Sequence, residues 1–445
     1  MEAPGAPGIA SSAAAAAPSA GGAVLSHGRG LPLPAPGAHC FVRRRPVGAA
    51  QILASGCWVH DAAAAVPDAA AALRVASPVA AAATGAHAMI QRRYFDQAYY
   101  DGLSDEDKET FYKCIKTGFD NADSGMGCYA MTPTDYTTFA PFFAKAIGDY
   151  HKGDPACAEK HENDWDISGV GEGGVLDLQK LGLAEELSMR VRVGRNLTSF
   201  PLPGAMTKED RIKFEVTMAG SFDALKEKFG GTVYSYSPDL GEGVEHPNKI
   251  DEEKYNELVA AHVMFKDMAA DPYLASAGIA SDWPYGRGCW QSEDKKKIVW
   301  FGEEDQLRIM VMKKGFLLNE VFNELKELLD AVESIEGVDF AKDDTYGYVT
   351  SCPTNLGTGM RASVHVKIPN LTSDGTDAKA KEIAGPLGLS VRGTGGEHTP
   401  IGADGTVDIS PSARLFIKES AIVQALYDGL KLLLDAEKAA APAEA

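Results

Sequence analysis

The stretch CPTNLGTGMRASVHVKIP, residues 352–369, joins a glycine-bearing loop to a strand. Its first half places a cysteine, a proline and two glycines within eight residues, which is typical of a turn. Its second half alternates apolar and polar residues, as a half-buried strand does. The chain thus passes directly from a loop that begins at Cys352 to an arginine, Arg361, within a predicted strand.

Four further arginines lie within or at the ends of predicted strands. Arg190 and Arg192 are two residues apart in ELSMRVRVGR, so in a strand their side chains face the same side. Arg308 follows an acidic turn, and Arg392 opens the glycine-rich segment RGTGGEHT. Guanidinium groups bind phosphate oxygens in a bidentate manner and stay charged. We expect the five arginines to share one anion site for a polyphosphate; five separate surface arginines are the alternative.

The acidic turn between the predicted strands KKKIVWF and QLRIMVM contains two neighbouring carboxylates. Glu303 and Glu304 follow Trp300 and Phe301, which would shelter them. A sheltered carboxylate can hold a cationic substrate by two hydrogen bonds, whereas an exposed acid in a turn is only solvated. Glu397, in the segment RGTGGEHT, would supply a second carboxylate from a mobile loop.

Two interpretations of Cys352 are open. A buried structural cysteine is the commoner case. A cysteine in a glycine-rich turn near cationic groups could instead be a thiolate of lowered pKa. No histidine adjoins it in the sequence, so covalent catalysis is not indicated. An electrostatic role toward a positive substrate is the better functional interpretation.

The composition limits the class of protein. The chain has 445 residues and a formal net charge of -19, with 45% hydrophobic and 24% charged residues, which is typical of a globular protein. The acidic balance argues against a nucleic-acid partner, which requires a basic surface, but not against a small anionic ligand. No apolar run approaches the ~20 residues that span a bilayer, so we expect no membrane partner. The seven cysteines are odd in number, widely spaced and without a CxxC pair, which argues against a disulfide framework or zinc site and indicates a reducing compartment.

The first part of the chain differs from the rest. Residues 1–88 are rich in Ala, Gly, Pro and Ser and contain only three acids, so we predict that they are disordered. They are an organelle transit peptide, a low-complexity tail, or sequence upstream of a true start at Met89. The expected location is accordingly the cytoplasm, or an organelle such as the mitochondrion. The predicted segments that follow are a helical domain (89–166), a loop-rich linker (167–184), a larger domain (185–440) and a tail (441–445).

The periodicity predicts an α+β fold with an antiparallel sheet covered by helices on one face, because strands and helices alternate without a βαβ rhythm. Ser104 and Thr207 are predicted helix N-caps. In the linker, GVGEGG lacks the flanking strand and helix of a nucleotide-binding fingerprint. The predicted helices are 104–119, 134–151, 208–229, 249–268, 316–335 and 420–439. The predicted strands are 186–195, 295–301, 306–312, 345–352 and 360–369.

Six motifs, in this order along residues 89–440, together resemble the phosphagen (ATP:guanido) kinases. They are DSGMGCYAMTPTDYTTFAPFF, MRVRVGR, DWPYGRGCW, FGEEDQLRIM, CPTNLGTGMRASVHVKIPNL and RGTGGEHT. The cysteine motif is specific by itself, and the SGMGCY loop is similar to the arginine kinase branch. The resemblance implies a small helical N-terminal domain, a larger domain with a twisted antiparallel sheet flanked by helices, and reversible transfer of the γ-phosphoryl group of MgATP to a guanidino nitrogen. It leaves open whether the protein is a monomer or a homodimer.

The resemblance also implies roles for individual residues. Catalysis would rest on Glu304, Glu397 and Cys352. ATP or ADP would bring Mg²⁺, held by the nucleotide and not by protein side chains. The nucleotide would contact Ser188, Met189, Arg190, Val191, Arg192, His262, Arg308, Arg361, Ala362, Ser363, Val364, His365, Arg392, Gly393, Thr394, Gly395, Gly396 and Glu397. The backbone of residues 361–365 and 392–396 would belong to this site. The guanidino substrate would contact Gly125, Met126, Gly127, Cys128, Tyr129, Glu304, Cys352 and Glu397.

Departures from the family pattern bear on the substrate. The acidic motif is usually NEED and here is GEED, so Gly302 replaces an asparagine and we expect altered turn stability with the chemistry retained. GTGMRAS and RGTGG resemble the creatine kinase branch. The leading hypothesis is an arginine kinase that makes phosphoarginine. The alternatives are a kinase for taurocyamine or creatine, and a non-catalytic nucleotide-binding relative.

Overall fold

In the computed structural model, the described residues are 89–152, 159–394 and 400–441. The predicted leader (1–88) and most of the predicted tail lie outside the described residues, as do Gly395, Gly396 and Glu397. Within the described part of the chain, no helix is both long and apolar enough to cross a membrane.

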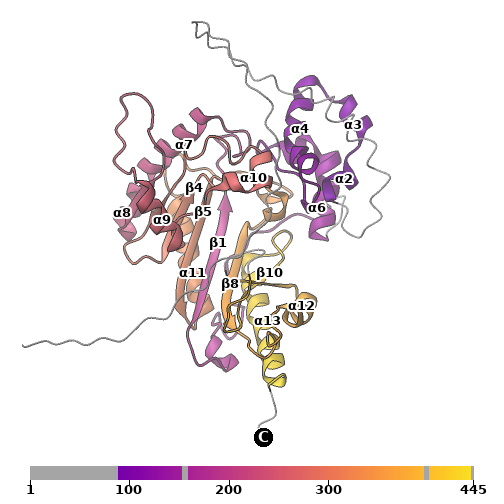
Figure 1. Ribbon diagram of the computed structural model, residues 1–445, viewed down its shortest axis with the longest axis vertical. Helices are drawn as coiled ribbons and strands as arrows, with labels where there is room; N and C mark the ends of the chain where they lie inside the picture. The colour runs from indigo at the N-terminus through magenta and orange to yellow at the C-terminus, as the bar shows by residue number, and fades with distance from the viewer. Residues whose placement is uncertain (1–88, 153–158, 395–399, 442–445) are drawn as a thin grey trace, which may run out of the picture. The chain divides into compact units, whose positions relative to one another are not determined.

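A group of helices forms the first described part of the chain (Figure 1). The predicted cap of the longest one is confirmed, because the Ser104 hydroxyl accepts a hydrogen bond from the backbone N–H of Asp107 at 3.1 Å. The prediction of one helix over 134–151 is wrong: the helix breaks at Phe139, and Pro141 lies in the first turn of a new helix, where its missing N–H costs nothing. The helices are α2 Ile90–Tyr94, α3 Gln97–Gly102, α4 Asp105–Asp120, α5 Asp135–Thr138 and α6 Ala140–His151.

The predicted antiparallel sheet is confirmed, and in the described part of the chain it has eight strands in the order β2-β3-β4-β5-β1-β8-β10-β9. The prediction of a strand over 345–352 is wrong for most of its length, since only Gly347 and Tyr348 pair, in a separate two-stranded ribbon. Gly347 has φ 71°, which interrupts extended backbone. The strands are β1 Leu187–Arg195, β2 Thr232–Ser235, β3 Gly288–Gln291, β4 Lys297–Phe301, β5 Leu307–Gly315, β6 Lys342–Asp343, β7 Gly347–Tyr348, β8 Met360–Lys367, β9 Leu389–Arg392 and β10 Thr406–Pro411.

The helices of the larger domain are shorter than predicted in two places. The helix predicted over 208–229 breaks at Phe222, although its Thr207 cap is confirmed by a reciprocal capping box with Asp210. The helix predicted over 249–268 ends at Ala260, because His262 adopts a left-handed backbone with φ 59°. The helices are α7 Lys208–Ser221, α8 Asp223–Phe229, α9 Glu252–Ala260, α10 Pro272–Ser276, α11 Leu318–Glu333, α12 Ala378–Ala384 and α13 Glu419–Ala439.

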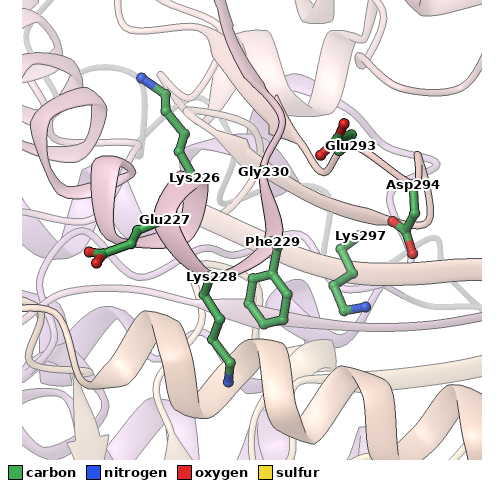
Figure 2. A pocket seen from close by; sticks show the side chains of 8 residues that line it. All are labelled: Lys226, Glu227, Lys228, Phe229, Gly230, Glu293, Asp294 and Lys297. Carbon is green, nitrogen blue, oxygen red and sulfur yellow. The ribbon is translucent and has the colours of Figure 1, made fainter. Parts of the chain in front are cut away.

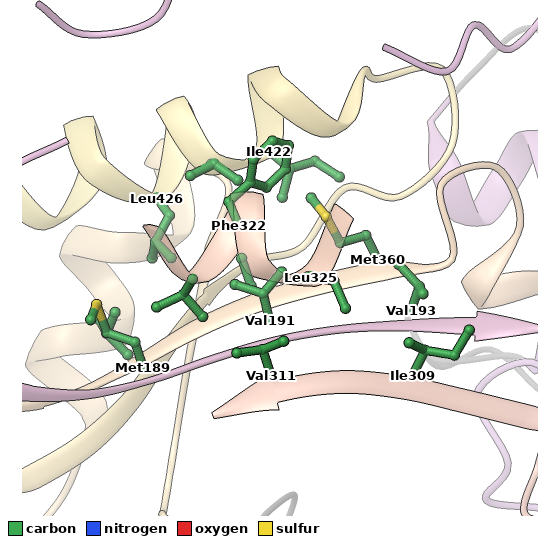
Figure 3. Close-up of a cluster of buried hydrophobic side chains, with 14 of the residues drawn as sticks. Met189, Val191, Val193, Ile309, Val311, Phe322, Leu325, Met360, Ile422 and Leu426 are labelled. Carbon is green, nitrogen blue, oxygen red and sulfur yellow. The ribbon is translucent and has the colours of Figure 1, made fainter. Parts of the chain in front are cut away.

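One face of the sheet is covered by α11 and α13, which contact the central strands. Figure 3 shows Met189, Val191 and Val193 of β1 pointing toward Phe322 and Leu325 of α11, and all five side chains are fully buried. Fully burying such a side chain contributes about 1.5–3 kcal/mol each. The alternate residues of β1 point to the opposite face, so the packing of this core decides where the arginines of β1 lie.

Candidate active site

The strand register places the predicted arginines on the face of the sheet opposite α11 and α13. Arg192 of β1 is the direct cross-strand partner of Arg361 of β8. On the other side of β1, Gly194 is the partner of Arg308 of β5. Arg190 precedes Arg192 by two residues and therefore shares its face. Four of the five predicted arginines thus lie on three adjacent central strands.

Asp408 of β10 extends this face toward the edge of the sheet. Its cross-strand partners are His365 of β8 and Arg392 of β9. One carboxylate oxygen accepts a hydrogen bond from Arg361 at 3.1 Å, and the other lies 3.8 Å from Nε2 of His365. Arg392 donates to the Ser390 hydroxyl at 3.0 Å. Asp408 was not predicted, and it orients the guanidinium of Arg361.

Three of the arginines line a common cavity of about 30 Å³. A cavity of this size takes about one water-sized group, so a nucleotide would lie along the open face and only an edge of a phosphoryl group would enter. The sequence prediction missed the other lining residues, of which only Arg414 lies outside the six quoted motifs. The cavity is lined by Arg192, Gly194, Asp305, Arg308, Asn355, Gly359, Arg361 and Arg414.

The arginines form a cluster of like charges. Burial, followed by the charges of Arg308 and Arg361, lowers the pKa of Arg190 to about 10. Burial and the same neighbours also hold the pKa of Arg192 well below its ordinary value. Grouping partly buried cations costs free energy unless an anion joins them, so this cluster is suited to a polyphosphate.

Arg308 differs from the other arginines because it is paired with the acidic turn. It donates to Glu303 at 2.7 Å and to Glu304 at 3.4 Å. Although burial lowers the pKa of Arg308, the two carboxylates raise it overall. Burial and the adjacent Asp305 carboxylate raise the pKa of Glu304 above its ordinary range. Arg308 therefore links the anion site to a carboxylate whose proton affinity is raised, as a general base requires.

Gly302 begins the acidic turn and has φ 78°, in the left-handed region that favours glycine. A Cβ on Gly302 would lie 1.9 Å from the carbonyl oxygen of Gly286. Close backbone contact therefore explains the glycine where the family usually has an asparagine.

We predict that Gly302→Ala destabilises the protein by more than about 1 kcal/mol, through both the backbone strain and the contact with Gly286. Gly337→Ala is the matched control, because Gly337 has φ 83° but nothing lies within 4 Å of its Cβ position. Urea unfolding of the three proteins measures the difference. Equal losses in the two variants would contradict the close-contact explanation.

Cys352 lies in the loop between β7 and β8 and is 6% exposed. Its Sγ is 3.1 Å from the Thr354 hydroxyl. The prediction of a lowered pKa is wrong for the protein without a ligand, because burial, and next the charge of Glu304, raise the pKa of this thiol. A cation placed beside both groups would oppose these two effects.

The loop predicted to bind the substrate, residues 125–129, reaches Cys352 and Glu304. Burial raises the pKa of Tyr129, and the nearby charges of Cys352 and Glu304 raise it further. Within the described part of the chain, the backbone N–H groups of Gly125, Met126 and Cys128 have no hydrogen-bond acceptor. The N–H of Gly127, between them, donates to the Ser124 hydroxyl at 3.1 Å. Unpaired backbone N–H groups within one turn suit a small anion such as a carboxylate.

The remaining predicted contacts are divided between the two faces of the sheet. The side chains of Met189, Val191, Ala362 and Val364 are fully buried in the core, so these residues could contact a nucleotide only through their backbone. Ser188, Ser363 and His365 lie on the arginine face according to the register. Three other predicted residues lie outside these strands. His262 is exposed just beyond α9, and Gly393 and Thr394, which follow β9, are buried and half-buried.

A second, larger hollow lies elsewhere on the sheet domain (Figure 2). Its volume is about 640 Å³, and its lining mixes lysines with acids. Lys226 and Lys228 already pair with Asp223 and Glu327. It contains no predicted site residue and no cluster of like charges, so we do not assign it a role. It is lined by Lys226, Glu227, Lys228, Phe229, Gly230, Glu293, Asp294 and Lys297.

Comparisons with known proteins agree with this geometry. Residues 87–148 match the model of the ATP:guanido phosphotransferase N-terminal domain, and residues 227–440 match that of its C-terminal catalytic domain. An arginine kinase of Limulus polyphemus is 36% identical over 334 residues, which cover 75% of this chain and 87% of that protein. An arginine kinase of Amphioctopus fangsiao is 38% identical over 337 residues, 76% of this chain and 90% of that protein.

Solved structures give the same fold. A lombricine kinase superposes with a TM-score of 0.68 at 31% identity, over 79% of this chain and 93% of that one. The duplicated taurocyamine kinase of Schistosoma mansoni has a TM-score of 0.66 at 30% identity, over 80% of this chain and 48% of that one. The arginine face, the acidic turn and the two matched domains therefore have one explanation: the chain belongs to the ATP:guanido phosphotransferases and is a phosphotransferase that acts on a guanidino nitrogen.

Proposed function

We propose that the protein transfers the γ-phosphoryl group of MgATP reversibly to L-arginine. The observation that carries the proposal is the meeting of the arginine face with Glu304 and Cys352, beside the unpaired N–H groups of the 125–129 loop. The arginine kinases among the relatives favour L-arginine as the substrate.

The residues divide the work of the reaction by charge. Arg190, Arg192, Arg308 and Arg361 would hold the phosphates and stabilise charge on the transferring group, with Arg392 at the edge of the same face. Phosphoryl transfer asks the protein mainly for in-line positioning and charge stabilisation.

Glu304 would hold the guanidinium and accept a proton from the attacking nitrogen. Its raised pKa suits a base that takes up a proton near neutral pH. Cys352 would face the same cation as a thiolate, and the 125–129 loop would hold the α-carboxylate. Glu397, outside the described residues, is proposed as a second carboxylate at the guanidinium.

Mg²⁺ is proposed to enter as part of the nucleotide. Among the residues that the structure describes, no group of three or more His, Cys, Asp or Glu side chains is arranged to hold a metal ion. Near the arginines, Glu303 and Glu304 are paired with Arg308, and Asp408 is paired with Arg361. When bound, the ion would neutralise part of the phosphate charge, and the arginines would neutralise the remainder.

Taurocyamine and lombricine are alternative candidate substrates, because two of the similar solved structures are a taurocyamine kinase and a lombricine kinase. A coupled ADP-release assay on the full chain with MgATP tests these and the main proposal, using arginine, taurocyamine, lombricine and creatine in parallel. Turnover with arginine and not with the others is the expected result. Turnover with another guanidine would keep the mechanism and overturn the arginine assignment. A folded, ATP-binding protein inactive with all four would contradict the proposal.

Cys352→Ser is expected to lower kcat by about 10- to 100-fold, because serine cannot supply a negative charge to the guanidinium at neutral pH. Stability should change little, since the hydroxyl can still bond to Thr354. Steady-state kinetics at saturating substrates measure the effect. Cys289→Ser, at another buried free cysteine, is the control for cysteine loss. An unchanged kcat in Cys352→Ser would favour the purely structural interpretation of this cysteine.

A further inference from the structure

The segment that carries Cys352 is held from the helical domain by its backbone carbonyls. The phenol of Tyr136, on α5, donates to the carbonyl of Thr350 at 2.7 Å and lies 3.2 Å from that of Ser351. The backbone N–H of Ala130, at the end of the substrate loop, also donates to Ser351, at 2.8 Å. Two consecutive residues before Cys352 are thus fixed by the domain that carries the substrate loop.

The residue after Cys352 is held in the same way. Nε2 of His151, at the end of α6, lies 2.9 Å from the carbonyl of Pro353. A carbonyl only accepts, so Nε2 carries the proton in this contact. Burial lowers the pKa of His151 to about 4, so the ring is neutral at physiological pH and has one N–H to give.

The sheet domain fixes the same segment from the other side. The backbone N–H of Ser351 donates to Asp305 at 2.7 Å, next to Glu304 in the acidic turn. Cys352 therefore lies between hydrogen bonds from both domains. Tyr136 is fully buried and packs its ring on Phe143 at 4.9 Å, so its hydroxyl has a defined position. Nothing in the reaction requires Tyr136 or His151 to touch either substrate.

We propose that Tyr136 and His151 are positioning residues that hold the carbonyls on both sides of Cys352 and thereby set its thiol against Glu304. The inference rests on the proposed function for its catalytic consequence. The geometry itself does not depend on the identity of the substrate. The helical domain then has two tasks, because it both carries the substrate loop and orients a sheet-domain residue at the guanidino end.

Four variants of the full chain test the proposal. Tyr136→Phe removes only the hydroxyl, and His151→Leu removes the donor. His151→Gln restores an N–H donor at a similar reach. Thr137→Val is the matched control, because Thr137 follows Tyr136 on α5 and bonds to Asp343 at 3.0 Å, another contact between the domains that does not involve residues 350–353.

Two readouts are needed. The first is the rate at which iodoacetamide alkylates Cys352, followed on its peptide by mass spectrometry. Tyr136→Phe and His151→Leu should change this rate at least about threefold, whereas His151→Gln and Thr137→Val should keep the wild-type rate. The second is the split between kcat and KM. Tyr136→Phe and His151→Leu should lower kcat about three- to tenfold and leave KM for ATP unchanged, and His151→Gln should recover kcat.

Wild-type alkylation rates and kcat in Tyr136→Phe and His151→Leu would overturn the proposal. Equal changes in Thr137→Val would also overturn it, because they would indicate general loosening between the domains. If Tyr136→Phe fails to fold, the alkylation rates and kcat values of His151→Leu and His151→Gln decide whether the proposal holds. If the wild-type protein uses no guanidine, the proposed function fails, and the alkylation rates still decide whether these residues position Cys352.

Discussion

Glu304→Gln is expected to lower kcat by about 10²–10³-fold while the protein remains folded. Glutamine keeps the shape of the side chain but cannot accept the guanidinium proton or pair with its charge. Arg308 keeps its 2.7 Å partner Glu303, so the turn retains an ion pair. Removing a carboxylate whose pKa is raised by burial and by Asp305 also removes an unfavourable charge, so stability should not fall.

The control for this prediction is Glu293→Gln, which removes the same charge at an exposed position outside the site. Steady-state assays with saturating MgATP and the guanidine identified in the substrate panel give kcat, and urea unfolding gives stability. A Glu304→Gln protein with near-normal kcat would remove Glu304 from the reaction. Unfolding of the variant would show instead that the carboxylate is needed for the structure.

The pH dependence offers a second check on Glu304. The raised pKa means that the free enzyme loses its carboxylate base as pH falls, at a higher pH than an ordinary glutamate would. The acid limb of kcat/KM should therefore lie above the normal carboxyl range. The residual activity of Glu304→Gln should lack this limb, whereas an unchanged limb would place the titrating group elsewhere.

Arg192→Met is expected to lower kcat by about 10³-fold or more, the lower end of the effect of arginines that stabilise transferring phosphoryl groups. The same change should make the ligand-free protein more stable, because burial, and next the charges of Arg308, Arg190 and Arg361, disfavour the charged form of Arg192. Opposite effects on activity and stability are the signature of a charge kept for a ligand.

Two measurements test Arg192→Met. Urea unfolding without ligand should give a higher midpoint than wild type. Addition of ATP at about 100 times its Kd should stabilise wild type by about 2.7 kcal/mol and stabilise the variant much less. Lys431→Met, on the exposed side of α13, is the charge control. A variant that loses stability and still responds fully to ATP would contradict the assignment of Arg192 to the anion site.

The arginine face could be predicted because strand alternation is local. Two arginines two residues apart in a strand must share a face, whatever the rest of the fold. Which strands lie beside β1 is a long-range property, so the pairing of Arg192 with Arg361 follows only from the structure. Asp305, Asn355 and Arg414 were missed for the same reason, because they reach the cavity from separate loops.

The errors have three physical origins: desolvation, backbone geometry and contacts between residues far apart in the sequence. The interpretation of Cys352 as a thiolate of lowered pKa took account of neighbouring charges but not of desolvation, which a sequence does not reveal. The predicted helices over 208–229 and 249–268 were too long because apolar spacing continues past Phe222 and Ala260, where backbone geometry ends the helix. The positioning contacts of Tyr136 and His151 join residues more than 200 positions apart, so no local pattern reports them.

The alternation of apolar residues and arginines in β1 also affects how the strands of the sheet pair during folding. A slip of one residue against β5 or β8 would turn Arg190 and Arg192 toward α11 and α13 and expose Met189 and Val191. Burying even one unpaired guanidinium costs several kcal/mol, so such a misfolded sheet would be strongly disfavoured at its centre. The charges that would bind a nucleotide thus also disfavour any shift of the central strand by an odd number of residues before a ligand is present.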